Sequence, residues 1–160
     1  MVCKGTDEVL HPETAVGIRE LLAPRAAVIT PNIFEASQLS GVKINSVEDI
    51  KNAAVKIYEL GAKNVFIKGG AKLGTPTAID LLYDGKDFII LESPKFDTTY
   101  THGAGCTSSA AITAGLAKGL SVKEAVEQAK AFITSAIKHS FPLNSYVGPT
   151  RHAAHRLFND

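Results

Sequence analysis

The residues best suited to chemistry lie in one stretch, residues 101–117, where a glycine-rich turn runs into a helical segment. Gly103 and Gly105 allow a tight turn and a close approach of backbone to ligand. Amides in the first turn of a helix have no intrahelical partner, and with the helix dipole they favour an anion such as phosphate. Cys106 lies in that turn, where a thiol becomes a better base or nucleophile. The stretch predicts either an anion site beside a reactive thiol or an ordinary loop-to-helix entry with a buried cysteine.

Two further polar clusters follow short apolar runs at residues 26–30 and 64–68, which we interpret as buried strands. Asn32 and Glu35 lie three residues apart at the start of a helix. This spacing fits an N-cap with a reciprocal glutamate, and the alternative is that their oxygens serve the metal of a nucleotide. Residues 68–72, Lys-Gly-Gly-Ala-Lys, offer amides and two ammonium groups to phosphate, or form a solvated surface turn. They are not a Walker A loop.

Apolar periodicity and capping residues predict the elements that position these clusters. Helices are expected from Pro12 with Ile18, Leu21 and Leu22 as an apolar side, after the 30–35 turn as far as Gly41, from Ser46 to Gly61, over 105–118, from Ser121 to Phe141, and in a short stretch near the C-terminus. Two more strands, 78–83 and 88–91, are joined by an Asp-Gly hairpin signal. Strands alternating with helices predict one α/β domain over residues 1–160, with a mainly parallel sheet flanked by helices. In such sheets ligands bind at the carboxyl ends of strands, where all three clusters fall.

Composition narrows the function classes. The 160 residues carry a net charge of +1, which gives no reason to expect a nucleic-acid or membrane partner. Two cysteines argue against a disulfide framework and a zinc site, so we expect a reducing, cytoplasmic setting. The sequence shows no apolar run long enough for a transmembrane helix, and its first residues lack the apolar core of a signal peptide.

The histidines allow weaker alternatives. His102 and Cys106 would suit a thiol–imidazole pair, and with it a cysteine hydrolase, although no third orienting group or hydrolase motif accompanies them. His152 and His155 are three residues apart without an acidic or cysteine partner nearby. We expect them on a solvated terminal helix and not at a metal site.

Taken together, the motifs resemble the ribokinase-like vitamin kinases of the hydroxymethylpyrimidine (phosphate) kinase family. Thr-Pro-Asn-x-x-Glu at 30–35, Lys-Gly-Gly at 68–70 and Thr-His-Gly-Ala-Gly-Cys-Thr at 101–107 occur in the family's order and at its separations. Met-Val-Cys-Lys-Gly at 1–5 and Asn-x-Tyr-Val-Gly-Pro at 144–149 look most like the Gram-positive pyridoxal kinases with two functional cysteines. The resemblance covers essentially every residue.

The resemblance implies ATP-dependent phosphorylation of a hydroxymethyl group on a pyridine or pyrimidine ring, with Mg²⁺. Cys106 would replace the usual aspartate as the base that deprotonates that hydroxyl. The anion hole for the transferring phosphoryl group would comprise Gly103, Ala104, Gly105 and the amide of Cys106.

The remaining site residues are also implied by this resemblance. Cys3 and Lys4 would belong to a lid, with the Cys3 thiol able to add to the aldehyde of pyridoxal, and Glu35 would serve Mg²⁺, directly or through water. The residues implied for the nucleotide are Asn32, Glu35, Lys68, Gly69, Gly70, Lys72, Asp80 and Lys130.

One departure from the family pattern matters. In the family the motif at residues 1–5 lies mid-chain, so the resemblance implies that the 160 residues correspond to the C-terminal, nucleotide-binding and catalytic part. We therefore expect the N-terminal portion that supplies the family's ring-binding residues to be missing. We expect a homo-oligomer, as a dimer, and pyridoxal or pyridoxine as substrate. Two alternatives stay open: a hydroxymethylpyrimidine/phosphomethylpyrimidine kinase of thiamine biosynthesis, and a nucleotide-binding fragment without catalysis.

Overall fold

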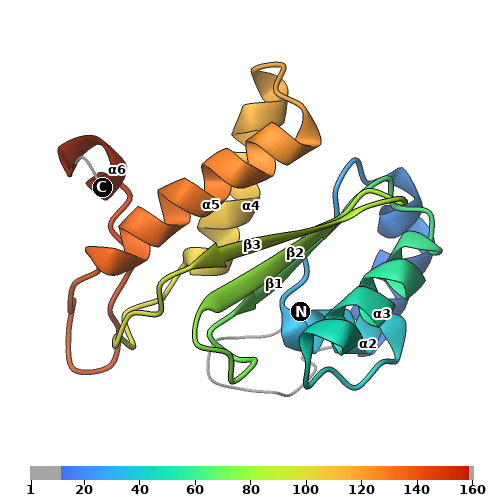
Figure 1. Cartoon of the computed structure of the whole chain (residues 1–160), viewed down its shortest axis with the longest axis horizontal. Helices are drawn as coiled ribbons and strands as arrows, with labels where there is room; N and C mark the ends of the chain where they lie inside the picture. The colour runs from blue at the N-terminus through green and yellow to red at the C-terminus, as the bar shows by residue number, and fades with distance from the viewer. Residues whose placement is uncertain (1–11, 159–160) are drawn as a thin grey trace. The chain divides into compact units, whose positions relative to one another are not determined.

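The computed structural model describes residues 12–158, so Cys3 and Lys4 lie outside the described residues. The chain divides into an N-terminal unit, Met1–Glu92, and a C-terminal unit, Ser93–Asp160 (Figure 1). Within residues 12–158, no helix has the length and apolar character needed to cross a membrane.

The N-terminal unit begins with a helical segment whose geometry changes along its length. The α-helix α1 (Pro12–Gly17) continues as a π-helical turn (Ile18–Leu22) and a 3₁₀ turn (Ala23–Arg25). The expected helix is present, but the apolar side predicted for it is only partly buried. Ile18 packs against the core, whereas Leu21 and Leu22 are 60% and 62% exposed, so neither leucine contributes to the core of the unit.

The next two helices begin at capping boxes, as the spacing of their residues predicts. Asn32 caps α2 (Ile33–Ser40), which ends at Gly41 in the left-handed region with φ of 71°. Ser46 caps α3 (Val47–Tyr58), and its N3 residue Asp49 accepts from the amides of Asn45 and Ser46. The Ser46 hydroxyl also donates to Asp49, at 2.9 Å. The bond from the Asn45 amide, followed by that from the Ser46 hydroxyl, holds the pKa of Asp49 below its usual value.

A three-stranded sheet of order β1-β2-β3 lies beside these helices (Figure 1). It consists of β1 (Val65–Gly70), β2 (Ala78–Tyr83) and β3 (Phe88–Ser93). The α/β class is confirmed, but there is less parallel pairing than expected among the described strands. β1 and β2 run antiparallel, and among the described residues of this unit parallel pairing is confined to two isolated bridges, Ile29 with Val65 and Asn32 with Lys68.

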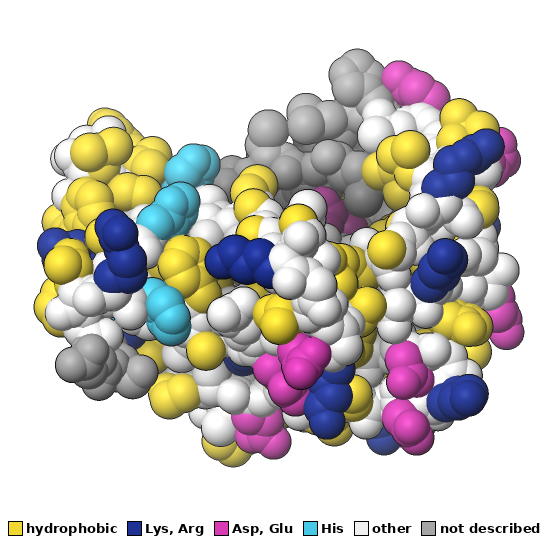
Figure 2. All heavy atoms as spheres, turned by 90° about the horizontal axis from the view of Figure 1, so that it is seen from above, with side chains coloured by type: hydrophobic (Ala, Val, Ile, Leu, Met, Phe, Trp, Pro, Cys, Tyr) yellow, Lys and Arg dark blue, Asp and Glu magenta, His cyan; other side chains and the backbone are white. Residues whose placement is uncertain are grey.

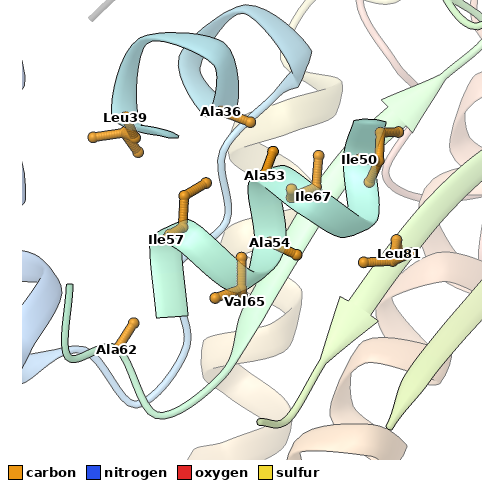
Figure 3. Packing of buried hydrophobic residues seen from close by; sticks show 10 residues of the cluster. All are labelled: Ala36, Leu39, Ile50, Ala53, Ala54, Ile57, Ala62, Val65, Ile67 and Leu81. Atoms are coloured by element: carbon orange, nitrogen blue, oxygen red, sulfur yellow. The ribbon is translucent and has the colours of Figure 1, made fainter. Parts of the chain in front are cut away.

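The core of the N-terminal unit lies between α2, α3 and the sheet (Figure 3). α3 contributes Ile50, Ala53, Ala54 and Ile57, which recur at helical spacing and therefore share one buried face. The strands contribute Val65, Ile67 and Leu81, each with no exposed surface. Because α3 packs on β1, the polar end of β1 is held beside the start of α2, where the parallel bridge of Asn32 lies.

The C-terminal unit is built on two packed helices, α4 (Ala104–Ala117) and α5 (Val122–Lys138), followed by the short α6 (Ala154–Leu157). Gly115 allows close packing of the pair, since a Cβ there would lie 2.9 Å from the Cβ of Ala125. Ser121 caps α5 with Glu124 in a capping box, as predicted. α5 in turn supports the C-terminal stretch, because the Arg151 amide donates to the Ala136 carbonyl at 2.9 Å.

Candidate active site in two groups of residues

The first group of candidate residues gathers where the 26–32 segment meets the end of β1. The amide of Lys68 donates to the Pro31 carbonyl at 2.9 Å, and its ammonium group donates to the Thr30 carbonyl. At the same end of β1 the amide of Gly70 donates to Oδ1 of Asp80 at 3.0 Å. Asp80 is 7% exposed, so this carboxylate belongs to the interior of the unit and not to a strand end in solvent.

Asn32 and Glu35 form the capping box that the sequence predicts. Oδ1 of Asn32 accepts from the Glu35 amide at 2.9 Å, and Oε2 of Glu35 accepts from the Asn32 amide at 2.9 Å. One carboxylate oxygen of Glu35 is thereby engaged with the backbone. The capping interpretation is confirmed, and a role toward nucleotide would be additional to it.

The glycine pair of the Lys-Gly-Gly motif has a steric explanation. A Cβ on Gly69 would lie 2.3 Å from the carbonyl oxygen of Ile79 on β2, so only glycine fits this approach of the strands. Gly70 has a φ of 55°, in the left-handed region. The pairing of β1 with β2 is irregular between Ile67 and Gly70, and Lys72 beyond it is exposed. The predicted turn is therefore partly an irregular strand end.

Asn32→Ala is expected to lower the free energy of unfolding by about 1 kcal/mol, because the Glu35 amide loses its cap. Asn32→Asp is the matched control, since a carboxylate caps equally well. Urea unfolding compares the stabilities, and titration with ADP compares the affinities. Equal stability of the Ala and Asp variants would contradict the capping role, and equal ADP affinity in all three proteins would remove Asn32 from the nucleotide site.

The second group lies in the C-terminal unit, at the turn that opens α4. Gly103 is the N-cap residue, with a φ of 84°, and has no side chain with which to cap the amides that follow. Cys106 is in the first turn of α4 and is a free, exposed thiol. The sequence alternative of a buried cysteine is therefore wrong. The turn presents an exposed thiol beside first-turn amides, as an anion site with an adjacent base requires.

The weaker alternative of a thiol–imidazole pair between His102 and Cys106 is not formed. The amide of His102 donates to the Gly148 carbonyl at 3.1 Å, and among the described residues no hydrogen bond joins the His102 ring to Cys106. The histidine bonded to this turn is His152, whose Nε2 lies 2.9 Å from Oγ1 of Thr107. His152 lies two residues before α6 and His155 lies on it, and both are exposed, as expected of a solvated terminal helix.

A pocket of about 560 Å³ opens beside Cys106 between α4, α5 and the segment leading into α6. Its wall includes Thr107, Phe132, His152 and His155. The rings of His152 and His155 lie 6.3 and 5.7 Å from that of Phe132. Figure 2 shows histidine side chains next to hydrophobic ones on this part of the surface.

The last candidate, Lys130, is half-buried on α5. Within residues 12–158 no three His, Cys, Asp or Glu side chains gather as a metal site. Such a cluster is not needed for Mg²⁺ in a kinase, which is commonly held by one or two carboxylates with phosphate oxygens and waters. Glu35, half-buried and with its second oxygen outside the capping bonds, fits that limited role.

Comparison with known proteins identifies the family of this chain. The family model for phosphomethylpyrimidine kinase matches residues 1–151. The chain belongs to this family. Among the family's curated members, pyridoxine kinase from Bacillus subtilis (strain 168) is 63% identical over 158 residues, which are 98% of this chain and 58% of that protein. Hydroxymethylpyrimidine/phosphomethylpyrimidine kinase from the same organism is 42% identical over 154 residues, 96% of this chain and 57% of that protein.

Solved structures agree with this family membership and confirm the ribokinase-like vitamin kinase resemblance. The ADP complex of Bacillus subtilis pyridoxal kinase has a TM-score of 0.93 at 63% identity, covering 98% of this chain and 59% of that one. Staphylococcus aureus pyridoxal kinase in complex with pyridoxal has a TM-score of 0.91 at 50% identity, covering 96% and 56%. This chain thus spans less than three-fifths of the length of these family members.

Sequence reasoning missed the residues that hold the α4 turn from the C-terminal side. Thr150 is 5% exposed, and its amide donates to the His102 carbonyl at 3.1 Å. A Cβ on Gly148 would lie 2.1 Å from the ring of Tyr100, so this glycine is required by packing. The sequence signal that could have directed attention here is the Val-Gly-Pro-Thr run at 147–150, which is small and apolar although it follows an exposed loop.

Proposed function

We propose that this chain is the nucleotide-binding and catalytic part, over residues 1–160, of an ATP-dependent kinase that phosphorylates the hydroxymethyl group of pyridoxal or pyridoxine. The observation that carries the proposal is the α4 turn, which presents the exposed thiol of Cys106 beside first-turn amides. Support for the substrates comes from relatives that are 50–63% identical: one is described with ADP and another with pyridoxal.

In this proposal Cys106 acts as the base. Its thiolate takes the proton of the hydroxymethyl group, the oxygen attacks the γ-phosphorus of ATP, and the bond from that phosphorus to the ADP oxygen breaks. Phosphoryl transfer depends mainly on positioning and on stabilising charge. The backbone from Gly103 to Cys106, with Ala104 and Gly105, would supply the amides that stabilise the phosphoryl oxygens.

The group around the end of β1 would bind the nucleotide. Lysine ammonium groups bind phosphate as point charges, the role proposed for Lys68 and Lys72. Glu35 would hold Mg²⁺, directly or through water, and the ion supplies neutralisation of phosphate charge when bound. The full nucleotide set proposed is Asn32, Glu35, Lys68, Gly69, Gly70, Lys72, Asp80 and Lys130.

The choice of pyridoxal over hydroxymethylpyrimidine rests on Cys3, proposed with Lys4 as part of a lid. A thiol adds reversibly to an aldehyde, which pyridoxal has and hydroxymethylpyrimidine lacks. We further propose a reducing, cytoplasmic setting, because Cys106 acts as a free thiol. We also propose that the protein is a homodimer. A second candidate function, hydroxymethylpyrimidine/phosphomethylpyrimidine kinase, is favoured by the family model and by the 42% identical relative.

The test is ATP consumption by the 160-residue chain with Mg²⁺, offered pyridoxal and hydroxymethylpyrimidine in separate reactions. We expect pyridoxal to be phosphorylated faster, and Cys3→Ala to weaken pyridoxal use more than hydroxymethylpyrimidine use. Phosphorylation of hydroxymethylpyrimidine alone would establish the second candidate. ADP binding without turnover on either ring would show a nucleotide-binding part that lacks an acceptor site.

A further inference from the structure

The stretch Val147–His152 runs alongside the turn that opens α4. Its backbone pairs with His102: the His102 amide donates to the Gly148 carbonyl at 3.1 Å, and the Thr150 amide donates to the His102 carbonyl at 3.1 Å. These bonds form a parallel bridge between His102 and Pro149. The residue directly before the Gly103 N-cap is therefore fixed by backbone bonds from a segment 46 to 48 positions away.

The same stretch reaches the other side of the turn through a side chain. Nε2 of His152 lies 2.9 Å from Oγ1 of Thr107, the residue after Cys106. The amide of Thr107 donates to the Gly103 carbonyl at 2.9 Å, so Thr107 closes the first turn of α4 over the N-cap residue. The four residues from Gly103 to Cys106 thus lie between two points that are bonded to one external segment.

That segment is itself anchored. Thr150 is buried, and the Arg151 amide is bonded to the Ala136 carbonyl on α5. The Tyr100 ring packs so closely on Gly148 that no Cβ fits between them. The His152 ring lies 6.3 Å from the Phe132 ring, also on α5. The segment that carries His152 is therefore held against α5, which restrains the position of the His152 ring beside Thr107.

An external bond is needed here because of the local sequence. Gly103 and Gly105 give the turn more conformational freedom than other residues would, and the first turn of a helix frays readily. Misplacement of reacting groups by about 1 Å can cost about a hundredfold in rate. A turn that must aim a thiol and several amides at one phosphoryl group gains from being held at Thr107.

We propose that His152 is a positioning residue: through Thr107 it fixes the first turn of α4, and so the direction of the Cys106 thiol and of the neighbouring amides. The kinetic consequence rests on the proposed kinase function, whereas the geometric claim does not. His155 supplies a matched comparison. Its ring also lies against Phe132, at 5.7 Å, but among the described residues no hydrogen bond joins it to α4.

The test reads the turn directly, through the rate at which iodoacetamide alkylates Cys106. The chain has two cysteines, so a Cys3→Ser background leaves one thiol. His152→Ala is expected to slow alkylation at pH 7 by about two- to fivefold, because a frayed first turn no longer holds the N-terminal amides of α4 beside the reacting sulfur. His155→Ala should leave the rate unchanged.

Two further variants separate positioning from general packing. Thr107→Val should slow alkylation as much as His152→Ala, and the double variant should add nothing further, because both remove one bond. His152→Gln, which can still reach Thr107, should restore most of the rate. Equal rates in His152→Ala and the parent would overturn the inference, as would equal slowing in His155→Ala. If His152→Ala fails to fold, Thr107→Val and His152→Gln decide the question.

Kinetics add a second readout. In a chain that turns over, His152→Ala should lower kcat for phosphotransfer while the KM for ATP changes little, because nucleotide binding is assigned mainly to the N-terminal unit. A lowered alkylation rate in a chain without turnover would leave the positioning role standing and count against the kinase proposal. Unchanged alkylation in an active chain would overturn the positioning role and leave the kinase proposal standing.

Discussion

Cys106→Ala is expected to lower phosphotransfer turnover by about 10²- to 10⁴-fold, the range that a positioned general base contributes. Alanine keeps the backbone amides of the turn and removes only the group that takes the proton. Because Cys106 is exposed, the substitution should change the free energy of unfolding by no more than about 0.5 kcal/mol. The measurement is the initial rate of ATP-dependent phosphorylation at saturating nucleotide, with ADP affinity measured in parallel.

Two controls sharpen this prediction. Cys106→Asp should retain much of the turnover, because the resemblance to the family implies that an aspartate is the usual base at this position. Thr113→Ala changes another exposed position of α4, whose hydroxyl only donates to the Ser109 carbonyl, and should leave turnover unchanged. Full activity in Cys106→Ala would remove the thiol from the mechanism. Equal losses in Cys106→Ala and Thr113→Ala would mean that the helix, and not the base, had been disturbed.

Leu81→Ala is expected to destabilise the N-terminal unit by about 2–5 kcal/mol, through lost burial and the cavity that remains. Leu81 has no exposed surface and lies on β2 against the cluster formed by α3 and β1 (Figure 3). A neighbouring strand position, Asp80, accepts the Gly70 bond, so the loss should also weaken ADP binding. Urea unfolding followed by circular dichroism measures the stability.

The matched control for Leu81 is Ile90→Ala on β3. Ile90 is 43% exposed, so its truncation removes little buried surface and should cost well under half as much as Leu81→Ala. Similar losses of stability in the two variants would contradict the prediction, because they would show that the burial of Leu81 does not set its contribution to the free energy of unfolding. A change confined to the slope of the urea transition, without a shift of its midpoint, would point to an altered denatured state.

Local chemistry allowed several elements to be predicted from the sequence. In the capping boxes of Asn32, Ser46 and Ser121, the N-cap side chain accepts from the amide three residues on, and the side chain of that residue accepts from the N-cap amide. The Asp84–Gly85 hairpin is equally local, because Oδ1 of Asp84 accepts from the amides of Lys86 and Asp87. Such interactions are complete within a few residues and need no knowledge of the fold.

Where the sequence prediction was wrong or incomplete, the deciding contact is distant in the chain. The fit of Gly69 depends on the carbonyl of Ile79 across the sheet, and the exposure of Leu21 and Leu22 depends on what packs beside them. The smaller share of parallel pairing arises because β1 takes the hairpin strand β2 as its neighbour on one side. No periodicity within a segment reports which surface it will meet.

The sequence by itself determined the capped helices, the hairpin, the glycine turn ahead of Cys106 and the family, because each is encoded by residues close together or by motifs in a fixed order. Only the tertiary structure decided that Cys106 is exposed and that the turn is bonded to His152 and Thr150 rather than to its own His102 ring. His152 and Thr107 are 45 positions apart. Their bond exists because α5 carries the C-terminal stretch back beside the start of α4, which is a consequence of packing.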